Sequence, residues 1–392
     1  MVEAWAGQRP RGCCLETRVK LVLFVPQLRS GGAQQVAVLL ASGLLSLGHE
    51  VHIAMAAMEG ELLRRVPPGA RLVDLGAGRP IRARRQLATL VDRIVPDAVI
   101  CFGIYTGIAA ALSRRMWRCD PTVVIRNENN LRIDWCQGTA LNRLIGPALS
   151  RWAARRAHIV AVSHSLAQAT ADFLRVPSGR VTTILNPVID DTVPVQQDSC
   201  VSLHPWLSDG GGPVFVAMGR LEHQKGFDTL IDAFSRVRRE SGARLVIFGQ
   251  GSLYATLQER IHARGLGEAI ALAGHTDYAI AQLRAAHAFV LSSRFEGFGL
   301  VVVEALWAGA RVIATRCDYG PAELLEEGRY GVLVAVDDAE ALGDAMLSSL
   351  QGRDCVERPS LEWFDRFAAT EAARQHVALI ESINARSGRP AA

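Results

Sequence analysis

The stretch VKLVLFVPQLRSGGAQQVAVLLASGLLSLGHEVHIAM, residues 19–55, decides the fold class. Val19–Val25 is a nearly continuous apolar run, which is typical of a strand buried on both faces of a sheet. A glycine turn at 30–32 leads into Ala33–Leu47, whose apolar residues follow helical spacing, and Val51–Met55 is the next apolar run. Strand, helix and strand with short connections predict a parallel βαβ unit.

The same alternation continues along the chain and is interrupted once, between Pro187 and Pro213, where the sequence is polar and rich in glycine. It predicts two Rossmann-like α/β domains with parallel sheets, which would face a central cleft at the carboxyl ends of their strands. The expected strands are Ala98–Cys101, Thr122–Ile125, His158–Val162 and Val181–Ile184, then Val214–Ala217, Ala243–Phe248, Ala269–Leu272, Ala288–Leu291 and Val312–Ala314. The expected divisions are a polar tail (1–17), an N-terminal domain (18–190), a linker (191–212), a C-terminal domain (213–365) and a C-terminal helix (366–392) that returns to the first domain. The final helical stretch, about Ser360–Asn384, is long enough for that return.

Composition excludes several classes of protein. With 49% apolar and 21% charged residues in 392, wholesale disorder is excluded. Eight scattered cysteines without a CxxC spacing indicate reduced thiols in a cytosolic protein. Met1–Arg11 lacks the apolar core of a signal peptide. The sequence also contains no run of about 20 predominantly apolar residues, so we expect no transmembrane segment.

The charge is unevenly distributed. Residues 1–200 hold 24 basic and 15 acidic side chains (+9), residues 201–392 hold 19 and 24 (−5), and the sum is the overall +4. Of the 43 basic residues only Lys20 and Lys225 are lysines. Because lysine is so rare here, a lysine in a loop that could bind an anion is a candidate for a chemical role.

One such position is the loop after the strand Val214–Ala217, where Arg220 and Lys225 stand five residues apart. A guanidinium offers a planar fork to phosphate oxygens and an ammonium acts as a compact charge, so the two can converge on one anion. The alternative is a solvated turn with two ordinary surface cations.

A second motif, Arg294–Glu304, follows the strand Ala288–Leu291 and opens a helix. The free N–H groups at a helix N-terminus are suited to phosphate. Glu296 in the loop and Glu304 in the helix can each accept hydrogen bonds from hydroxyls of a sugar-containing ligand. A helix-capping acid and an acid at the edge of the core are the alternative.

Glycines mark two further turns. Gly31 and Gly32 stand at the first strand–helix turn, where the backbone can approach a ligand closely, although taken alone they are better explained by a tight turn. Gly249 and Gly251 follow Phe248, but the third glycine and distal acid of a dinucleotide site are missing, so the sequence gives little support to a nicotinamide enzyme.

Taken together, the motifs resemble the retaining glycosyltransferases of family 4, which have the two-domain GT-B fold. The matching segments are SGGAQQVAVLLASGLLSLGHEV (30–51), GRLEHQKGFDTLIDAF (219–234), the glycine turn at 248–251, and EGFGLVVVEALWAGARVIAT (296–315) with the E-x7-E spacing. ICFGIYTGIAAALS (100–113), VVIRNENN (123–130) and ILNPVI (184–189) look like bacterial members that build lipid-linked or cell-surface glycans. The resemblance covers nearly all of residues 18–380.

The resemblance implies a role for each matching residue. Arg220 and Lys225 would neutralise the diphosphate leaving group of a UDP or GDP sugar, Glu296 would hold hydroxyls of the transferred sugar, and Glu304 those of the ribose. The remaining donor contacts would come from Gly31, Gly32, Gly249, Phe298, Gly299 and Leu300. The acceptor would attack the face that the diphosphate leaves, and the departing phosphate would take its proton, so no separate nucleophile is expected.

Acceptor binding is expected in the first half of the chain. Many relatives carry a histidine after the strand Ala98–Cys101 that this sequence lacks, so Arg126, Glu128 and His164 become the acceptor-side candidates. A charged pair at a strand end and a structural histidine are the alternatives. No Asp-x-Asp triplet occurs, so neither a metal nor a cofactor is expected.

The expected activity is transfer of a hexose or N-acetylhexosamine to a growing cell-envelope glycan, polyprenyl-diphosphate-linked or otherwise. Arginines with Trp117 and Trp152 suit an anionic membrane surface, which predicts a cytoplasmic enzyme peripheral on the inner face of the membrane; a merely solvated surface is the alternative. The sequence contains none of the motifs that bind nucleic acid, so no nucleic-acid partner is expected. The rival functions are a GT-B epimerase, a soluble glycoside synthase, or a nucleotide-sugar-binding subunit without turnover.

Overall fold

The computed structural model describes residues 18–29, 31–136, 139–192 and 202–386, and the chain divides into two compact units. The first comprises residues 1–195 with 362–392, and the second comprises 196–361. The expected polar tail 1–17 and the part of the expected linker at 193–201 lie outside the described residues. Of the rest of that linker, residues 191–192 belong to the first unit and 202–212 to the second. In the second unit, Arg244 donates to Asp209 through both terminal nitrogens, at 2.6 and 2.7 Å.

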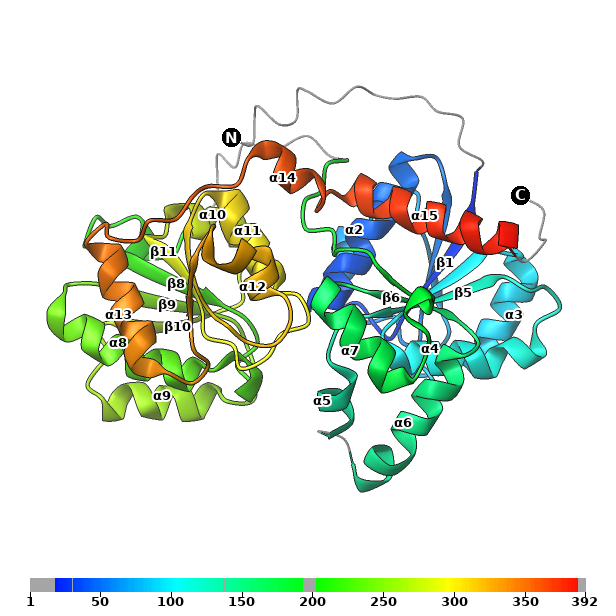
Figure 1. Ribbon diagram of the computed structural model, residues 1–392, viewed down its shortest axis with the longest axis horizontal. Coiled ribbons are helices and arrows are strands. Elements are labelled where there is room, and N and C mark those ends of the chain that lie inside the picture. The colour runs from blue at the N-terminus through cyan, green and yellow to red at the C-terminus, as the bar shows by residue number, and fades with distance from the viewer. Residues whose placement is uncertain (1–17, 30, 137–138, 193–201, 387–392) are drawn as a thin grey trace. The chain divides into compact units, whose positions relative to one another are not determined.

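The first unit is built on a seven-stranded parallel sheet in the order β3-β2-β1-β4-β5-β6-β7 (Figure 1). Leu21 of β1 pairs with Val51 of β2 on one side and Ala98 of β4 on the other. The strands are β1 (Lys20–Val25), β2 (Glu50–Met55), β3 (Arg71–Asp74), β4 (Ala98–Phe102), β5 (Thr122–Asn127), β6 (His158–Ala161) and β7 (Val181–Thr183). The helices are α2 (Gly32–Ser46), α3 (Arg84–Ile94), α4 (Ile104–Ser113), α5 (Leu131–Cys136), α6 (Ala140–Ala154), α7 (His164–Leu174) and α15 (Ala369–Arg386), with 3-10 turns η1 (Glu61–Arg65), η2 (Arg114–Met116) and η3 (Ser178–Arg180).

The second unit has a six-stranded parallel sheet in the order β10-β9-β8-β11-β12-β13, with helices on its faces (Figure 1). Its strands are β8 (Val214–Met218), β9 (Arg244–Phe248), β10 (Ile270–Gly274), β11 (Ala288–Leu291), β12 (Arg311–Thr315) and β13 (Val332–Val334). The helices are α8 (Phe227–Glu240), α9 (Tyr254–Ala263), α10 (Ala279–Ala285), α11 (Leu300–Ala308), α12 (Pro321–Leu324) and α13 (Ala339–Leu350), with 3-10 turns η4 (Pro205–Leu207), η5 (His223–Lys225) and η6 (Glu326–Gly328). The expectation of two α/β domains with parallel sheets is confirmed.

Two of the strands were not among those expected from the sequence. β3 is mostly exposed and carries two charges, so it lacks the apolar run of a buried strand. β13 lies in the apolar run VLVAV (332–336) but is only three residues long and partly exposed. Both lie at the edge of a sheet.

The helical stretch Ser360–Asn384 is also divided, into α14 (Leu361–Asp365) and α15. Between these helices the backbone leaves helical geometry, because Phe367 O accepts hydrogen bonds from Val188 N at 2.9 Å and Ile189 N at 3.0 Å.

Helix α15 packs against α2 in the first unit (Figure 1). The approach is close because α2 carries Gly43, where a Cβ atom would come within 2.1 Å of Ala369 O. The start of α15 is fixed by Asp191, whose carboxylate accepts a hydrogen bond from Thr370 N at 3.0 Å.

A fully buried arginine joins α15 to the sheet. Arg126 of β5 donates to Asn186 Oδ1 at 2.6 Å, to Glu128 Oε1 at 2.9 Å and to His376 Nε2 at 2.7 Å. His376 Nδ1 lies 2.6 Å from Ala372 O, and since a carbonyl only accepts, Nδ1 carries the proton and Nε2 accepts from Arg126. Burial, together with the charge of Arg126, lowers the pKa of His376 to about 3.

This histidine makes the stability of the first unit depend on pH. The unfolded chain binds a proton at His376 below about pH 6.5, whereas the folded chain does so only near pH 3, so stability present at neutral pH is lost as the pH falls across this interval. For one such group the slope is up to about 1.4 kcal/mol per pH unit. In the parent, the free energy of unfolding of the α15 region, measured with urea, should fall between pH 6.5 and pH 4.5. We expect this fall to be smaller in His376→Gln, which keeps an acceptor for Arg126 but does not titrate. The same change at exposed His262 of α9 should leave the slope as in the parent, and equal slopes for parent and His376→Gln would contradict the assignment.

Candidate functional site

The chemistry-bearing loops of the second unit follow three neighbouring strands, β9, β8 and β11, at the carboxyl edge of its sheet. The loops after β8 and β9 meet backbone to backbone: Gly219 N donates to Phe248 O at 3.0 Å, and Leu221 N donates to Gln250 O at 2.9 Å. Gly249 has φ 149°, and a Cβ atom there would lie 1.8 Å from Gly219 O. Gly249, a candidate donor contact, is therefore required by loop packing whatever ligand is bound.

The loops after β8 and β11 are also held together. Arg294 N donates to Gln224 O at 2.8 Å, and Gln224 Nε2 donates back to Phe295 O at 3.0 Å. Gly226, at φ 60°, lies so close to the second loop that a Cβ atom would come within 2.1 Å of Ser292 O. Two segments some 70 positions apart in sequence thus behave as one surface.

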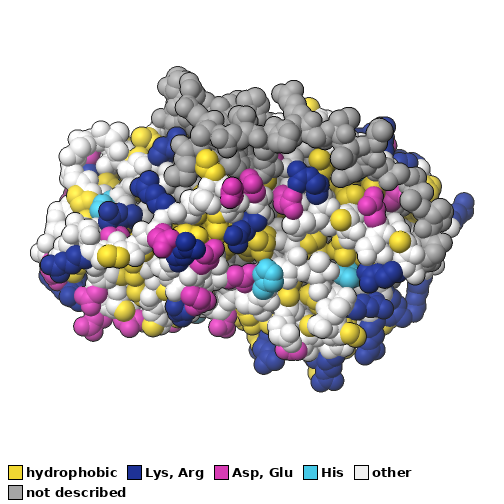
Figure 2. Space-filling view, turned by 45° about the horizontal axis from the view of Figure 1, so that its top comes forward, with side chains coloured by type: hydrophobic (Ala, Val, Ile, Leu, Met, Phe, Trp, Pro, Cys, Tyr) yellow, Lys and Arg dark blue, Asp and Glu magenta, His cyan; other side chains and the backbone are white. Residues whose placement is uncertain are grey.

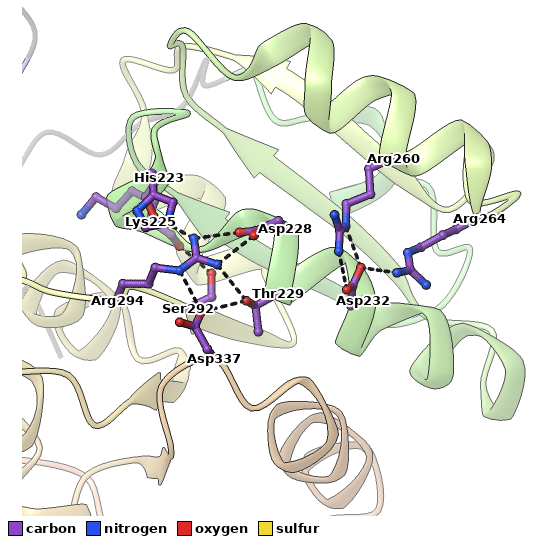
Figure 3. Close-up of polar contacts among 10 residues, drawn as sticks. All are labelled: His223, Lys225, Asp228, Thr229, Asp232, Arg260, Arg264, Ser292, Arg294 and Asp337. Carbon is purple, nitrogen blue, oxygen red and sulfur yellow. Dashed lines mark hydrogen bonds and ion pairs between the residues drawn. The ribbon is translucent and has the colours of Figure 1, made fainter.

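Arg294 is the centre of this arrangement (Figure 3). Its guanidinium donates to Asp228 at 3.0 and 2.8 Å and to His223 O at 2.9 Å, and its Nε lies 2.8 Å from Asp337 Oδ1. Burial acts to raise the pKa of Asp228, but the hydrogen bonds from Arg294 outweigh it and hold that pKa below its usual value. The arginine therefore connects the loop after β11, the loop after β8 and the start of α8.

Lys225 and Glu296, predicted as separate ligand contacts, form an ion pair within this surface. Lys225 Nζ lies 2.5 Å from Glu296 Oε1, and Ser293 Oγ donates to the same oxygen at 2.6 Å. The side chains are 15% and 7% exposed, so water screens the pair only partly. Thr315 Oγ1 donates to Ser293 O at 2.5 Å, which ties the supporting serine to β12. Glu296 is thereby held in one orientation.

The other predicted donor residues lie in the same unit. Arg220 is exposed and donates to Gln224 Oε1 at 2.9 Å. Helix α11 begins at Leu300 after Gly299, which has φ 94°, and it has neither a side-chain cap nor an acidic residue in its first turn. Such a helix start offers N–H groups and partial positive charge to an anion. Phe298 is buried beside it, and Glu304, 8% exposed, lies one turn into the helix.

Cys317 is the buried thiol nearest to this chemistry. Burial raises its pKa to about 12, and the charge of Glu296 adds to that effect. The thiol therefore stays protonated at neutral pH and is not a nucleophile.

The remaining candidates lie in the first unit. Gly31 precedes α2 and Gly32 is its first residue, so their contact with a donor stays a prediction. Glu128 lines a pocket of about 280 Å³ at the carboxyl ends of β4 and β5. Arg126 is completely buried and is not part of the lining, so it acts on that pocket through Glu128 rather than by touching a ligand. His164 is the exposed first residue of α7 and lies outside the pocket lining.

Sequence reasoning missed the residues that hold the site together. Arg294 was quoted within its motif but given no role, and Ser293 and Gln224 were not singled out. The available signal for Arg294 was a charged residue three positions after the end of a buried strand. Its partners Asp228 and Asp337 lie 66 positions before it and 43 after it, and only the fold brings them together.

Two family models match the chain, one in each unit. Residues 30–192 match Glycosyltransferase Family 4, and residues 204–360 match Glycosyl transferases group 1. Between them the two matches include the loops described above and the pocket beside β4 and β5.

Individual proteins agree with the family models. Mannosylfructose-phosphate synthase of Agrobacterium fabrum is 33% identical over 185 residues, 43% of this chain and 40% of its own length. The lipopolysaccharide core biosynthesis mannosyltransferase LpsB of Rhizobium meliloti is 32% identical over 234 residues, 55% of this chain and 63% of its own length. The chain thus covers less than two thirds of either relative.

A solved structure resembles the whole fold. HepE of Anabaena, in complex with UDP and glucose, superposes with a TM-score of 0.74 over 93% of this chain and 100% of its own, at 19% identity. At that identity the likeness establishes the GT-B fold, with its two parallel-sheet domains.

Removal of the Arg294 clamp should loosen the two loops that it joins. We expect Arg294→Gln to speed amide hydrogen exchange in residues 219–226 and 292–299 by about tenfold or more, since hydrogen bonds to charged groups contribute roughly 1.5–3 kcal/mol. Arg260→Gln is the matched control, because Arg260 and Arg264 bind Asp232 farther along α8, away from the loops (Figure 3). Equal exchange in both variants would show that Arg294 does not hold the loops.

Proposed function

We propose that this protein, which has the GT-B fold, is a glycosyltransferase that moves a hexose or N-acetylhexosamine from a UDP or GDP sugar to a growing cell-envelope glycan with retention of configuration. The observation that carries the proposal is the Lys225–Glu296 pair, held beside the uncapped start of α11. It places a cation for phosphate and an oriented carboxylate for sugar hydroxyls on one surface. LpsB, named for lipopolysaccharide core biosynthesis, and HepE, solved with UDP and glucose, support this reading.

Different side chains of this site would contact different parts of the donor. Lys225 and Arg220 would balance the diphosphate charge, and the N–H groups at the start of α11 would donate hydrogen bonds to its oxygens. Glu296, already oriented by Lys225 and Ser293, would accept hydrogen bonds from the transferred sugar, and Glu304 from the ribose. Because these groups are in place before the donor arrives, little reorganisation accompanies the reaction.

In the proposed step, the bond between the sugar's anomeric carbon and the diphosphate oxygen breaks, and its electron pair goes to the phosphate. An acceptor hydroxyl oxygen bonds to the same carbon on the face that the phosphate leaves, and its proton goes to the departing phosphate oxygen. Negative charge grows on the phosphate as the bond breaks, which is where Lys225, Arg220 and the α11 dipole act. We propose that neither metal nor cofactor takes part.

The acceptor is proposed to be presented at an anionic membrane surface. Lys and Arg side chains gather along one side of the first unit (Figure 2). The exposed side chains of that unit include Arg115, Arg118, Arg155 and Arg156. Trp117 and Trp152, expected to reach the membrane, instead pack partly buried against the core, with Arg156 4.4 Å from the centre of the Trp152 ring. The proposal therefore rests on charge attraction, at about 1 kcal/mol per cation near the surface. No helix in the described part of the chain is long and apolar enough to span a membrane.

Transfer assays test the function. Purified protein incubated with labelled UDP and GDP sugars and bacterial membrane lipids should release nucleoside diphosphate and move label into the glycan fraction. Lys225→Ala and Glu296→Ala should each lower kcat at least about 100-fold, as removal of one preorganised charge does. Lys20→Ala is the control, because the chain's other lysine donates to Ile94 O in the first unit. Unchanged transfer by the Lys225 and Glu296 variants would overturn the site assignment.

The same assay separates the rival functions. Donor binding without nucleotide release would indicate a non-catalytic subunit, and conversion of the donor to an isomeric nucleotide sugar would indicate an epimerase. Label found only in small water-soluble products would indicate a soluble glycoside synthase and overturn the envelope acceptor.

A further inference from the structure

The amino ends of β5, β6 and β7 carry a cluster of arginines in the first unit. Three connections lead into these strands, residues 114–121, 155–157 and 175–180. The last turn of α15 reaches the same edge of the sheet, because Thr122 of β5 donates to Asn384 Oδ1 at 2.6 Å. The arginine cluster comprises Arg114, Arg115, Arg118, Arg155, Arg156, Arg175, Arg180 and Arg386.

Contacts with neutral groups join members of the arginine cluster. Arg114 donates to Arg156 O at 2.8 Å, and Arg180 donates to Arg155 O at 3.3 Å. A backbone carbonyl accepts these hydrogen bonds without cancelling the charge of the guanidinium. Asp120, which binds Arg114, is the one acidic residue in the three connections. Most of the positive charge at this edge therefore has no acid to balance it.

The surroundings of the arginine cluster agree with a positive field. Burial lowers the pKa of His158, the first residue of β6, to about 4, and the charges of Arg386 and Arg180 add to that effect. One further acid, Asp92 of α3, lies beside the arginine cluster and accepts from Arg118 N at 2.7 Å. Two acids therefore face eight arginines, and the edge suits an anionic partner.

The aromatic side chains of this region indicate the class of partner. Arg156 lies 4.4 Å from the centre of the Trp152 ring and Arg115 lies 6.0 Å from it, while Trp117 packs partly buried against the core. Single-stranded nucleic acid needs free aromatic faces on which its bases stack, and these two rings are already in use. Guanidinium groups bind phosphate oxygens without stacking, and Met116, 40% exposed, adds an apolar group that suits the interface of a bilayer.

We propose that the arginine cluster docks the first unit on anionic phospholipid headgroups, with the amino ends of β5, β6 and β7 toward the bilayer and their carboxyl ends away from it. The inference rests on the proposed function, in which a membrane presents the acceptor, and it names the surface that makes the contact. Because β5 is six residues long, at about 3.3 Å per residue, the carboxyl edge lies roughly 20 Å from the headgroups. A glycan that extends from the lipid, rather than the lipid itself, would reach Gly31, Gly32 and Glu128 at that edge.

A second basic segment provides a matched control. Arg79 and Arg82 are exposed in the loop after β3, at the carboxyl edge of the same sheet. Like Arg118 and Arg155 of the arginine cluster, they form no side-chain hydrogen bond or ion pair within the described part of the chain. The two pairs therefore differ in the edge that they occupy and not in charge, and replacement of either pair should leave the fold intact.

Co-sedimentation of the full chain with vesicles measures docking without turnover. We expect vesicles of phosphatidylglycerol and phosphatidylcholine to bind it at least about tenfold more tightly than phosphatidylcholine alone, and added salt to weaken that binding. Arg118→Gln combined with Arg155→Gln should weaken it about 30-fold, since each cation near the surface contributes about 1 kcal/mol. Arg79→Gln combined with Arg82→Gln should change it less than about threefold, and thermal unfolding like the parent's would show that both variants are folded.

Three results would overturn the proposal. The first is failure of the parent to bind the anionic vesicles, whether or not it binds an oligonucleotide or polyglutamate. The second is equal vesicle binding by the two double variants, since charge attraction would then not be localised at the amino edge. The third is a larger loss in the variant of Arg79 and Arg82, which would place the bilayer at the carboxyl edge.

The outcome is distinguishable from failure of the proposed function. Vesicle binding that the variant of Arg118 and Arg155 weakens, without transfer from any nucleotide sugar, would leave the docking surface standing and remove the function. Transfer by a protein that does not bind the anionic vesicles would do the reverse.

Discussion

The guanidinium of Arg294 is the contact on which the geometry of the second unit's site depends. Loops after parallel strands have no ladder hydrogen bonds of their own, so their relative position must come from side chains and close backbone contacts. Arg294 reaches Asp228, Asp337 and a carbonyl of the neighbouring loop, while its own backbone N–H binds Gln224 O. With the loops joined in this way, a cation from one and a carboxylate from the other can meet at 2.5 Å as Lys225 and Glu296 do.

Much of this could be predicted from the sequence, because each piece is local. The run at 19–55 forms β1, α2 and β2, since apolar continuity and helical spacing are visible within one window. Lys225 and Glu296 could each be placed at the carboxyl end of a strand. Their contact could not, because it requires β8 to pair with β11 although β9 and β10 lie between them in sequence. Strand order is a property of the whole sheet, and no window of sequence carries it.

For Arg126, the sequence suggests surroundings that differ from those in the structure. A charged residue in VVIRNENN looks like a ligand contact at a strand end, yet the structure buries it completely. What makes burial tolerable is distant in sequence: Asn186 and the neutral nitrogen of His376, 60 and 250 positions away, share its hydrogen bonds with the nearby Glu128. Asn186 lies in the segment ILNPVI (184–189) and His376 in the last helix, but nothing in either stretch of sequence indicates a contact with Arg126.

The division of the chain has a consequence for how such proteins can diversify. The first unit is assembled from two separate stretches, because α15 packs on α2 and supplies His376 to Arg126, whereas the second unit is the uninterrupted segment 196–361. A single inserted cassette therefore carries Arg220, Lys225, Glu296, Glu304 and the arginine clamp that arranges them. Recombination at its two ends would exchange all of these together and leave the pocket beside β4 and β5, with its buried support, in the recipient chain. The architecture thus makes the loop surface of the second unit and the pocket of the first unit heritable as separate modules.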